Sequence, residues 1–141
     1  GNNVGAKTGT GDWLVLLNPD AEAAPNWLQT LSDAILAHPG TRMFASAQYN
    51  LHQPQELDGV GDCYLGFGFP WRGGFAHPVS AMPGHGECFS PCGAGAVYHR
   101  ETFLEHGGFD ERFVCFCEGG DIGYPTDPCC DHRCIARSEC I

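Results

Sequence analysis

The first apolar run of the chain stops abruptly at an acidic turn. Residues 12–17 read DWLVLL and are followed at once by Asn18-Pro19-Asp20. An unbroken apolar run of this length predicts a strand covered on both faces. Pro25 is tolerated as a first helical residue, and His38-Pro39-Gly40 would end the helix. Between them, apolar residues recur at helical spacing: Trp27, Leu28, Leu31, Ala34 and Ile35.

The rest of the chain continues the alternation of strands and helices. Residues 43–49 predict a second strand and residues 93–99 a third, followed by a short glycine-capped helix over residues 100–108. Residues 50–86 are rich in glycine, proline and aromatic residues and predict a long irregular segment. Residues 112–117 are apolar again and end on Glu118. These elements predict a single α/β unit.

The charge of the chain excludes one class of partner. Its 141 residues carry a formal net charge of −10, and Lys7 is the single lysine. Such a surface could not neutralise a run of phosphates, so nucleic acid is not expected as a partner. A nucleotide is not excluded, because it needs only a metal ion and a few backbone donors. No apolar stretch reaches transmembrane length.

The position of Asp20 has two interpretations. In open α/β sheets, ligands collect beyond the carboxyl ends of the strands, and Asp20 lies just past such an end. A carboxylate there can hold a hard divalent cation, which in turn holds phosphate oxygens. The alternative is that Asn18-Pro19-Asp20 is an ordinary turn with a helix-capping acid.

The cysteines are numerous and unevenly placed. There are nine of them, an odd number, and four lie in the last thirteen residues. Without a secretory signal, this favours unpaired thiols over a framework of disulfides. The tail sequence CCDHRC leaves a zinc site open, although its spacing differs from that of common zinc sites. Phe69 and Trp71 could stack on a sugar, but packing beneath a long loop is the favoured reading.

Several motifs together resemble a glycosyltransferase family. NNVG, GDWLVLLNPDAEAAPNWL and CGAGAVYHRETFLEHGGFDERF, followed by a Glu and an Asp, occur in the order found in family 2 glycosyltransferases. The bacterial rhamnosyltransferase-like branch, which makes cell-surface polysaccharides, writes its metal motif as Asn-Pro-Asp. The resemblance implies a partial GT-A fold, a Rossmann-like three-layer α/β/α arrangement for nucleotide-diphosphate sugars. It also implies metal-dependent, inverting transfer of the sugar to an acceptor hydroxyl.

The resemblance assigns roles to particular residues. Asp20 matches the acid that binds Mg²⁺ or Mn²⁺ on the donor diphosphate, and Asn18 stands where many relatives have a second acid. Asn2 and Asn3 match a stretch near the donor. The turn Cys92-Gly93-Ala94, preceded by Pro91, matches the loop beneath the donor sugar and the acceptor. Glu118 and Asp121 match catalytic positions at the end of the domain.

The chain departs from the family in two places. The family's first strand and loop, which hold the nucleotide base, precede the NNVG stretch, so the chain resembles a fragment. The expected base is an aspartate, but Gly119 occupies its position, and Pro125 and Pro128 would break the helix that should follow. The resemblance therefore implies a partial catalytic domain over residues 1–124 and a divergent cysteine-rich tail over residues 125–141.

Three functions remain open on this basis. The first is a glycosyltransferase that uses a nucleotide-diphosphate sugar and a glycan or lipid-linked acceptor, in the cytoplasm or at the inner face of the membrane. The second is a catalytically inactive relic of that fold that binds a partner or a sugar. The third is a small metal-binding protein that uses the Cys/His tail. Missing strands would leave an open sheet edge, so we expect pairing with a second copy of the chain.

Overall fold

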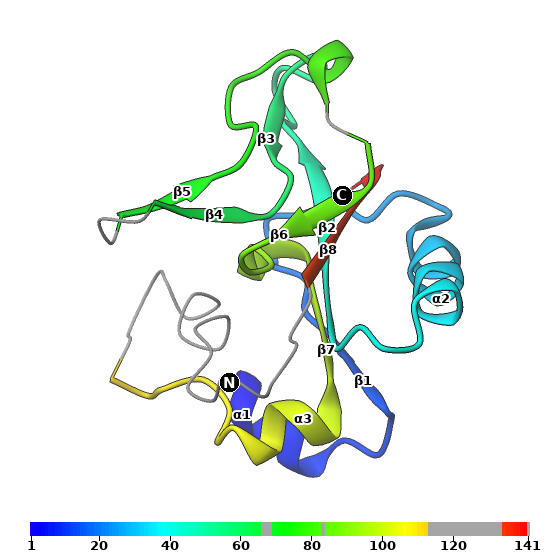
Figure 1. The fold of residues 1–141 in the computed structure, drawn as a ribbon, viewed down its shortest axis with the longest axis vertical. Helices are drawn as coiled ribbons and strands as arrows, with labels where there is room; N and C mark the ends of the chain where they lie inside the picture. Colours follow the sequence, from blue (N-terminus) through cyan, green and yellow to red (C-terminus); the bar gives the residue numbers. More distant parts are fainter. Residues whose placement is uncertain (66–68, 83, 113–133, 141) are drawn as a thin grey trace.

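The computed structural model describes residues 1–65, 69–82, 84–112 and 134–140, the last segment by its backbone. It is a mixed α/β fold built around one main sheet (Figure 1). The strands β1 (Trp13–Val15), β7 (Ala96–His99), β2 (Met43–Tyr49), β8 (Cys134–Cys140) and β6 (Gly86–Cys88) lie in that order. Neighbouring pairs are antiparallel except β2 and β8, which run parallel. The coarse prediction of a mixed α/β unit is confirmed.

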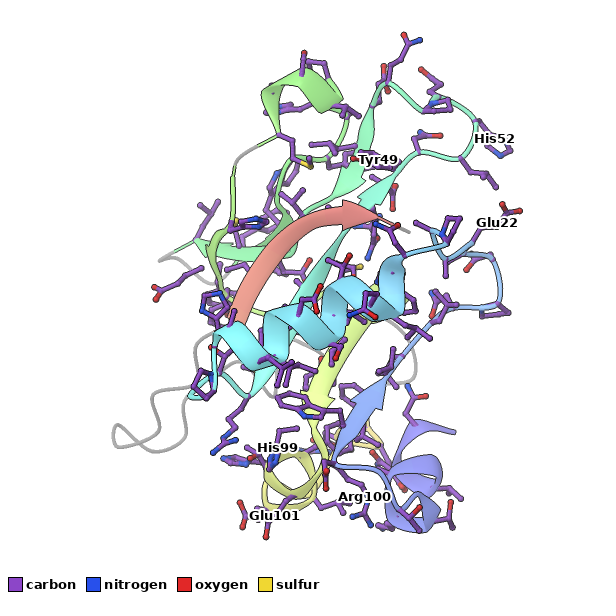
Figure 2. All side chains as sticks on the ribbon, turned by 90° about the vertical axis from the view of Figure 1, so that its right-hand side faces the viewer. Glu22, Tyr49, His52, His99, Arg100 and Glu101 are labelled. Atoms are coloured by element: carbon purple, nitrogen blue, oxygen red, sulfur yellow. The ribbon has the colours of Figure 1, made fainter. Side chains whose placement is uncertain are left out.

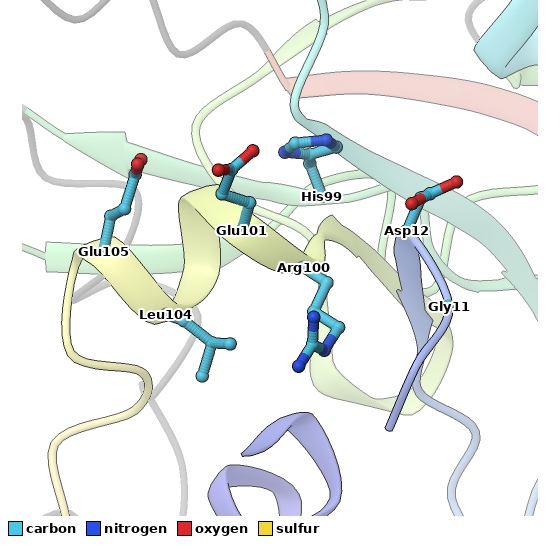
Figure 3. Close-up of a pocket in the computed structure, with 7 residues that line it drawn as sticks. All are labelled: Gly11, Asp12, His99, Arg100, Glu101, Leu104 and Glu105. Atoms are coloured by element: carbon cyan, nitrogen blue, oxygen red, sulfur yellow. The ribbon is translucent and has the colours of Figure 1, made fainter. Parts of the chain in front are cut away.

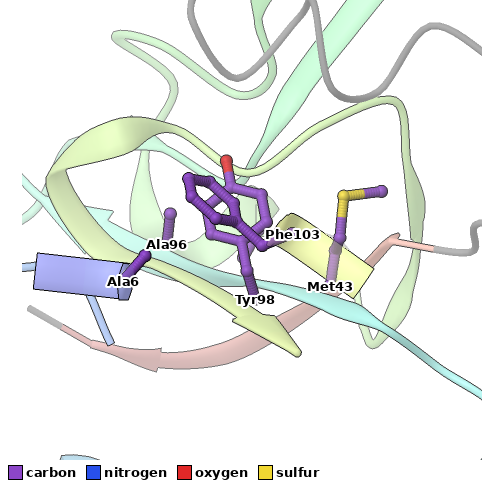
Figure 4. Close-up of a cluster of buried hydrophobic side chains, with 6 residues drawn as sticks. Ala6, Met43, Ala96, Tyr98 and Phe103 are labelled. Atoms are coloured by element: carbon purple, nitrogen blue, oxygen red, sulfur yellow. The ribbon is translucent and has the colours of Figure 1, made fainter. Parts of the chain in front are cut away.

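Helices cover both faces of the sheet because the side chains of the central strands alternate in direction. Phe44 and Val97 pack against Trp27, Leu31 and Ala34 of α2 (Trp27–Ala37), which crosses the face seen in Figure 2. The opposite face packs against α1 (Asn2–Thr8) and α3 (Arg100–Glu105) (Figure 4). That second cluster comprises Ala6, Met43, Ala45, Ala96, Tyr98 and Phe103.

The predicted second strand and the first two predicted helix ends agree closely with the structure. The second strand spans Met43–Tyr49, as predicted. Helix α2 stops at Ala37, before the predicted His38-Pro39-Gly40 break, although it begins at Trp27 rather than at Pro25. Helix α3 ends before Gly107 and Gly108, whose φ angles of 84° and 77° suit glycine. Breaks of this kind act within a few residues and can be read from the sequence.

Two strand predictions need correction. Residues 93–95 form a short 3₁₀ turn, so strand β7 starts only at Ala96. Strand β1 is not covered on both faces, because Val15 and Leu17 are 41% and 42% exposed. Helix α2 packs over the central strands β2 and β7, and β1 contributes Trp13 to the same apolar cluster.

The segment predicted to be irregular contains short strands. These are β3 (Leu57–Gly59), which pairs with β2, and the ribbon of β4 (Asp62–Leu65) with β5 (Phe69–Arg72), followed by the 3₁₀ turn η1 (Val79–Ala81). Non-local contacts fix their register, among them the 2.6 Å ion pair between Arg72 and Asp58. Phe69 and Trp71 are 52% and 53% exposed, so the prediction that they pack beneath a loop is wrong. Within the described residues, no helix is long and apolar enough to cross a membrane.

The open side of β1 leads to a prediction about assembly. In the described part of the chain β1 pairs with β7 alone, and Leu16 and Asn18 donate their N–H groups to that side. The N–H groups of Val15 and Leu17 therefore face the other side, which is where a further strand would pair. We expect a dimer at tens of micromolar by light scattering, and we expect Val15→Lys to make it monomeric. Leu36→Lys, on the exposed side of α2, is the control that should leave the dimer intact, whereas a wild-type monomer would contradict the prediction.

Candidate functional site

The predicted metal-binding residue lies at an exposed turn at the end of β1. The N–H of Ala21 donates to the carbonyl of Asn18 (3.1 Å), which closes a turn with Pro19 and Asp20 at its centre. Proline suits the first central position of such a turn because its φ is already set. Asn18 and Asp20 are both exposed, so their side-chain oxygens are open to a ligand.

The turn of Cys92, Gly93 and Ala94 lies directly beside this acidic turn. Pairing between β1 and β7 continues past the strands: the N–H of Leu16 donates to Ala96 (2.8 Å) and the N–H of Asn18 to Ala94 (3.2 Å). The structure therefore brings together two motifs that are far apart in the sequence. A Cβ on Gly93 would meet nothing within 4 Å, so the surface beside the acidic turn is uncrowded there.

The chemistry of these groups suits a hard divalent cation that arrives with phosphate. Magnesium in such sites keeps several waters and binds one or two carboxylates besides substrate phosphates. Asp20 supplies one carboxylate and Asn18 a neutral amide oxygen, both hard oxygen ligands. Among the residues that the structure describes, no three His, Cys, Asp or Glu side chains gather into a metal-binding group. Asp20 and Asn18 are thus the residues of this turn that could contact such an ion.

Asn3 makes two hydrogen bonds to a distant part of the backbone. Its side-chain nitrogen donates to the carbonyl of Phe109 (2.8 Å), and its side-chain oxygen accepts from the N–H of Phe109 (2.9 Å). These paired bonds fasten α1 to the segment after α3. Asn2 is exposed on the same helix, which precedes β1, whereas the acidic turn follows β1. Among the residues assigned near the donor, Asn18 is therefore hydrogen-bonded to Ala94, whereas Asn3 is hydrogen-bonded to Phe109.

Asp62 is a neighbour of the candidate site that sequence reasoning missed. Its backbone pairs with Ser90, and the Ser90 hydroxyl donates to its carboxylate (3.3 Å). Burial raises the pKa of Asp62, while the Ser90 hydrogen bond and the charge of Arg72 lower it in part. Ser90 is fully buried and stands two residues before Cys92, so Asp62 helps to fix the start of that turn. Asp62 lies in the segment predicted to be irregular, where no periodicity drew attention to it.

A surface hollow lies at the other end of β1 from the acidic turn (Figure 3). Its volume is about 490 Å³, and it is lined by Gly11, Asp12, His99, Arg100, Glu101, Leu104 and Glu105. Its two nitrogen-bearing side chains are engaged with the fold: Arg100 Nε donates to Ala6 (2.8 Å), and His99 Nδ1 lies 3.0 Å from the Thr102 hydroxyl. We assign the candidate site to the acidic turn, because its two motifs converge there.

Glu118 and Asp121, the catalytic residues expected from the family resemblance, lie outside the described residues, as does Gly119. The Cys129–His132 part of the tail also lies outside them. Residues 134–140, by contrast, form β8 within the main sheet, between β2 and β6. The end of the tail thus belongs to the same sheet as the candidate site.

Comparison with known proteins adds no relative. No protein-family model matches the chain, and neither a curated protein nor a solved structure does.

Proposed function

We propose that the chain is part of a glycosyltransferase domain that binds a nucleotide-diphosphate sugar through a divalent metal. One observation carries the proposal: the 3.2 Å hydrogen bond from Asn18 to Ala94, which sets the acidic turn beside the small-residue turn. The sequence motifs that resemble family 2 glycosyltransferases supply these same two turns. The resemblance supports the inverting reaction class, and the hydrogen bond supports a shared location for the two motifs.

Each residue has a definite part in the proposed reaction. Asp20 would hold Mg²⁺ or Mn²⁺, and Asn18 would add a neutral oxygen; the bound ion would neutralise charge on the diphosphate. Gly93 and Ala94 leave room for the sugar, since small residues allow close approach of the backbone. In the reaction class that the resemblance implies, the acceptor hydroxyl bonds to the anomeric carbon as the bond to the diphosphate oxygen breaks, and a carboxylate takes the hydroxyl proton. Gly119 occupies the position of that carboxylate in this chain.

Binding of the donor is the direct test of this proposal. Isothermal titration calorimetry of the full chain with a panel of nucleotide-diphosphate sugars should detect binding in Mn²⁺ and little or none in EDTA. Equal affinity in Mn²⁺ and in EDTA would contradict the proposed role of the metal in donor binding. No binding to any member of the panel in Mn²⁺ would refute the donor class.

We expect the chain to transfer sugar slowly even if it binds the donor. The position of the expected base is Gly119, which cannot accept a proton, and positioned proton transfer contributes roughly 10²–10⁴-fold. A transfer and donor-hydrolysis assay with Mn²⁺ or Mg²⁺ should therefore give rates near background. Turnover of about one per second that is lost in Glu118→Gln would contradict this expectation and identify Glu118 as the base.

A non-catalytic binding module is the second candidate function. Gly119 at the base position favours it, because the substitution removes proton transfer without removing the donor-binding turns. The two candidates differ in one measurable respect: both should bind the donor, but only an enzyme should turn it over.

A further inference from the structure

Two cysteines that are distant in the sequence occupy opposed positions in the main sheet. Strands β6 and β8 are antiparallel, and their register pairs Cys88 with Cys134. Directly opposed residues in antiparallel strands have Cα atoms about 4.5 or 5.5 Å apart. Both separations lie within the range of about 4.4–6.8 Å that a disulfide requires. The backbone at these two positions therefore meets the first geometric condition for a disulfide.

The contacts of Cys88 place its side chain on one face of the sheet. Its Sγ lies 3.6 Å from the carbonyl of Ser90, and its side chain packs against the cluster beneath α1 and α3. Gly61 has no side chain and so allows Cys88 to pack against its backbone. A Cβ at position 61 would come within 2.7 Å of Cys88 Sγ. Opposed residues share one face of a sheet, so position 134 lies on the same face as Cys88.

We propose that Cys88 and Cys134 form a redox-sensitive disulfide that fastens β8 into the sheet. The oxidant is a small disulfide such as oxidised glutathione. One protein thiolate attacks it, forms a mixed disulfide and releases one glutathione thiolate. The second protein thiolate then attacks the protein-bound sulfur, which closes the Cys88–Cys134 bond and releases the second glutathione. Two protein thiols are oxidised, their protons pass to solvent, and one glutathione disulfide is reduced.

The bond would act on the segment that leads into the candidate site. After β6, the chain runs through Phe89, Ser90 and Pro91 into the Cys92–Ala94 turn. Strand β8 lies between β2 and β6. The disulfide would close a loop from residue 88 to residue 134 that includes this turn and α3. Closing a long loop stabilises chiefly by restricting the unfolded chain, so oxidation should stabilise the whole fold.

The positions of the basic residues allow a direct test by mass spectrometry. Trypsin cuts after Arg72, Arg100, Arg133 and Arg137, so Cys134 falls in the peptide 134–137, apart from Cys140. Cys88 and Cys92 fall in the peptide 73–100, and Cys63 falls in the peptide 43–72. After equilibration of the full chain with oxidised glutathione, we expect peptide 73–100 linked to peptide 134–137. The link should persist in Cys92→Ser and disappear in Cys88→Ser.

A second measurement checks the structural consequence. Oxidation should raise the Tm of the wild-type chain by about 5 °C or more and leave the Tm of Cys88→Ser and Cys134→Ser unchanged. The proposal would be overturned by the absence of the 73–100/134–137 link or by its persistence in Cys88→Ser. It would equally be overturned if links to the peptides of Cys63 or Cys140 were as abundant. None of these outcomes depends on donor binding.

Discussion

Replacing Asp20 with alanine is expected to weaken Mn²⁺-dependent binding of a nucleotide-diphosphate sugar by roughly 100-fold. The reason is that Asp20 supplies a carboxylate at the proposed metal position, where Asn18 offers only a neutral oxygen. The fold should change little, because Asp20 is exposed at the centre of a turn. Titration calorimetry measures the affinity, and thermal unfolding checks the fold.

Glu22 provides a matched control for the Asp20 variant. It is another exposed acid on the same connection between β1 and α2 (Figure 2). Glu22→Ala removes the same charge and should leave metal-dependent binding unchanged. An equal loss in both variants would indicate a general charge effect, and unfolding of Asp20→Ala would show that the residue serves the turn instead. Asp20→Asn, which retains a good turn residue, should lose affinity while keeping the fold.

Alanine at Gly108 is expected to destabilise the protein by about 3 kcal/mol or more, among the larger effects of a single substitution. Two causes combine. Gly108 has a φ of +77°, and a Cβ there would lie 2.6 Å from Asn3 Oδ1 and 3.2 Å from Phe103 Cε1. The Asn3 oxygen cannot move away without losing its hydrogen bond from the N–H of Phe109. Urea unfolding measures the loss.

The neighbouring glycine separates backbone strain from crowding. Gly107 also has a positive φ, +84°, but a Cβ there would meet nothing within 4 Å. Gly107→Ala should therefore cost only the strain, about 1–2 kcal/mol. Adding Asn3→Ala to Gly108→Ala removes part of the crowding, so the double variant should lose less stability than the sum of the single variants. Equal losses at Gly107 and Gly108 would show that Asn3 does not restrict this turn.

The hydrogen bonds between Asn3 and Phe109 could not be predicted from the sequence. The motif resemblance predicts that Asn2 and Asn3 lie near the donor, and the structure adds that the amide of Asn3 is bound to the backbone of Phe109. An asparagine amide can serve a ligand or a distant backbone equally well, and the side chain carries no local sign of which it does. The same applies to Asp62, whose partner Ser90 comes from another strand.

Local patterns by themselves determined the second strand, the stop of α2 at Ala37 and the glycine end of α3. The apolar spacing, Pro39 and the glycines at 107 and 108 act on the backbone within a few residues. Their effects can therefore be predicted from the sequence. The motifs also predicted that Asn18, Asp20 and Ala94 belong to the candidate site. Only the tertiary structure decided that Asn18 bonds to Ala94, that β1 pairs on one side alone within the described residues, and that the register of β6 and β8 places Cys88 opposite Cys134. Those facts depend on strand register between distant segments, which packing of the whole sheet selects and no local pattern encodes.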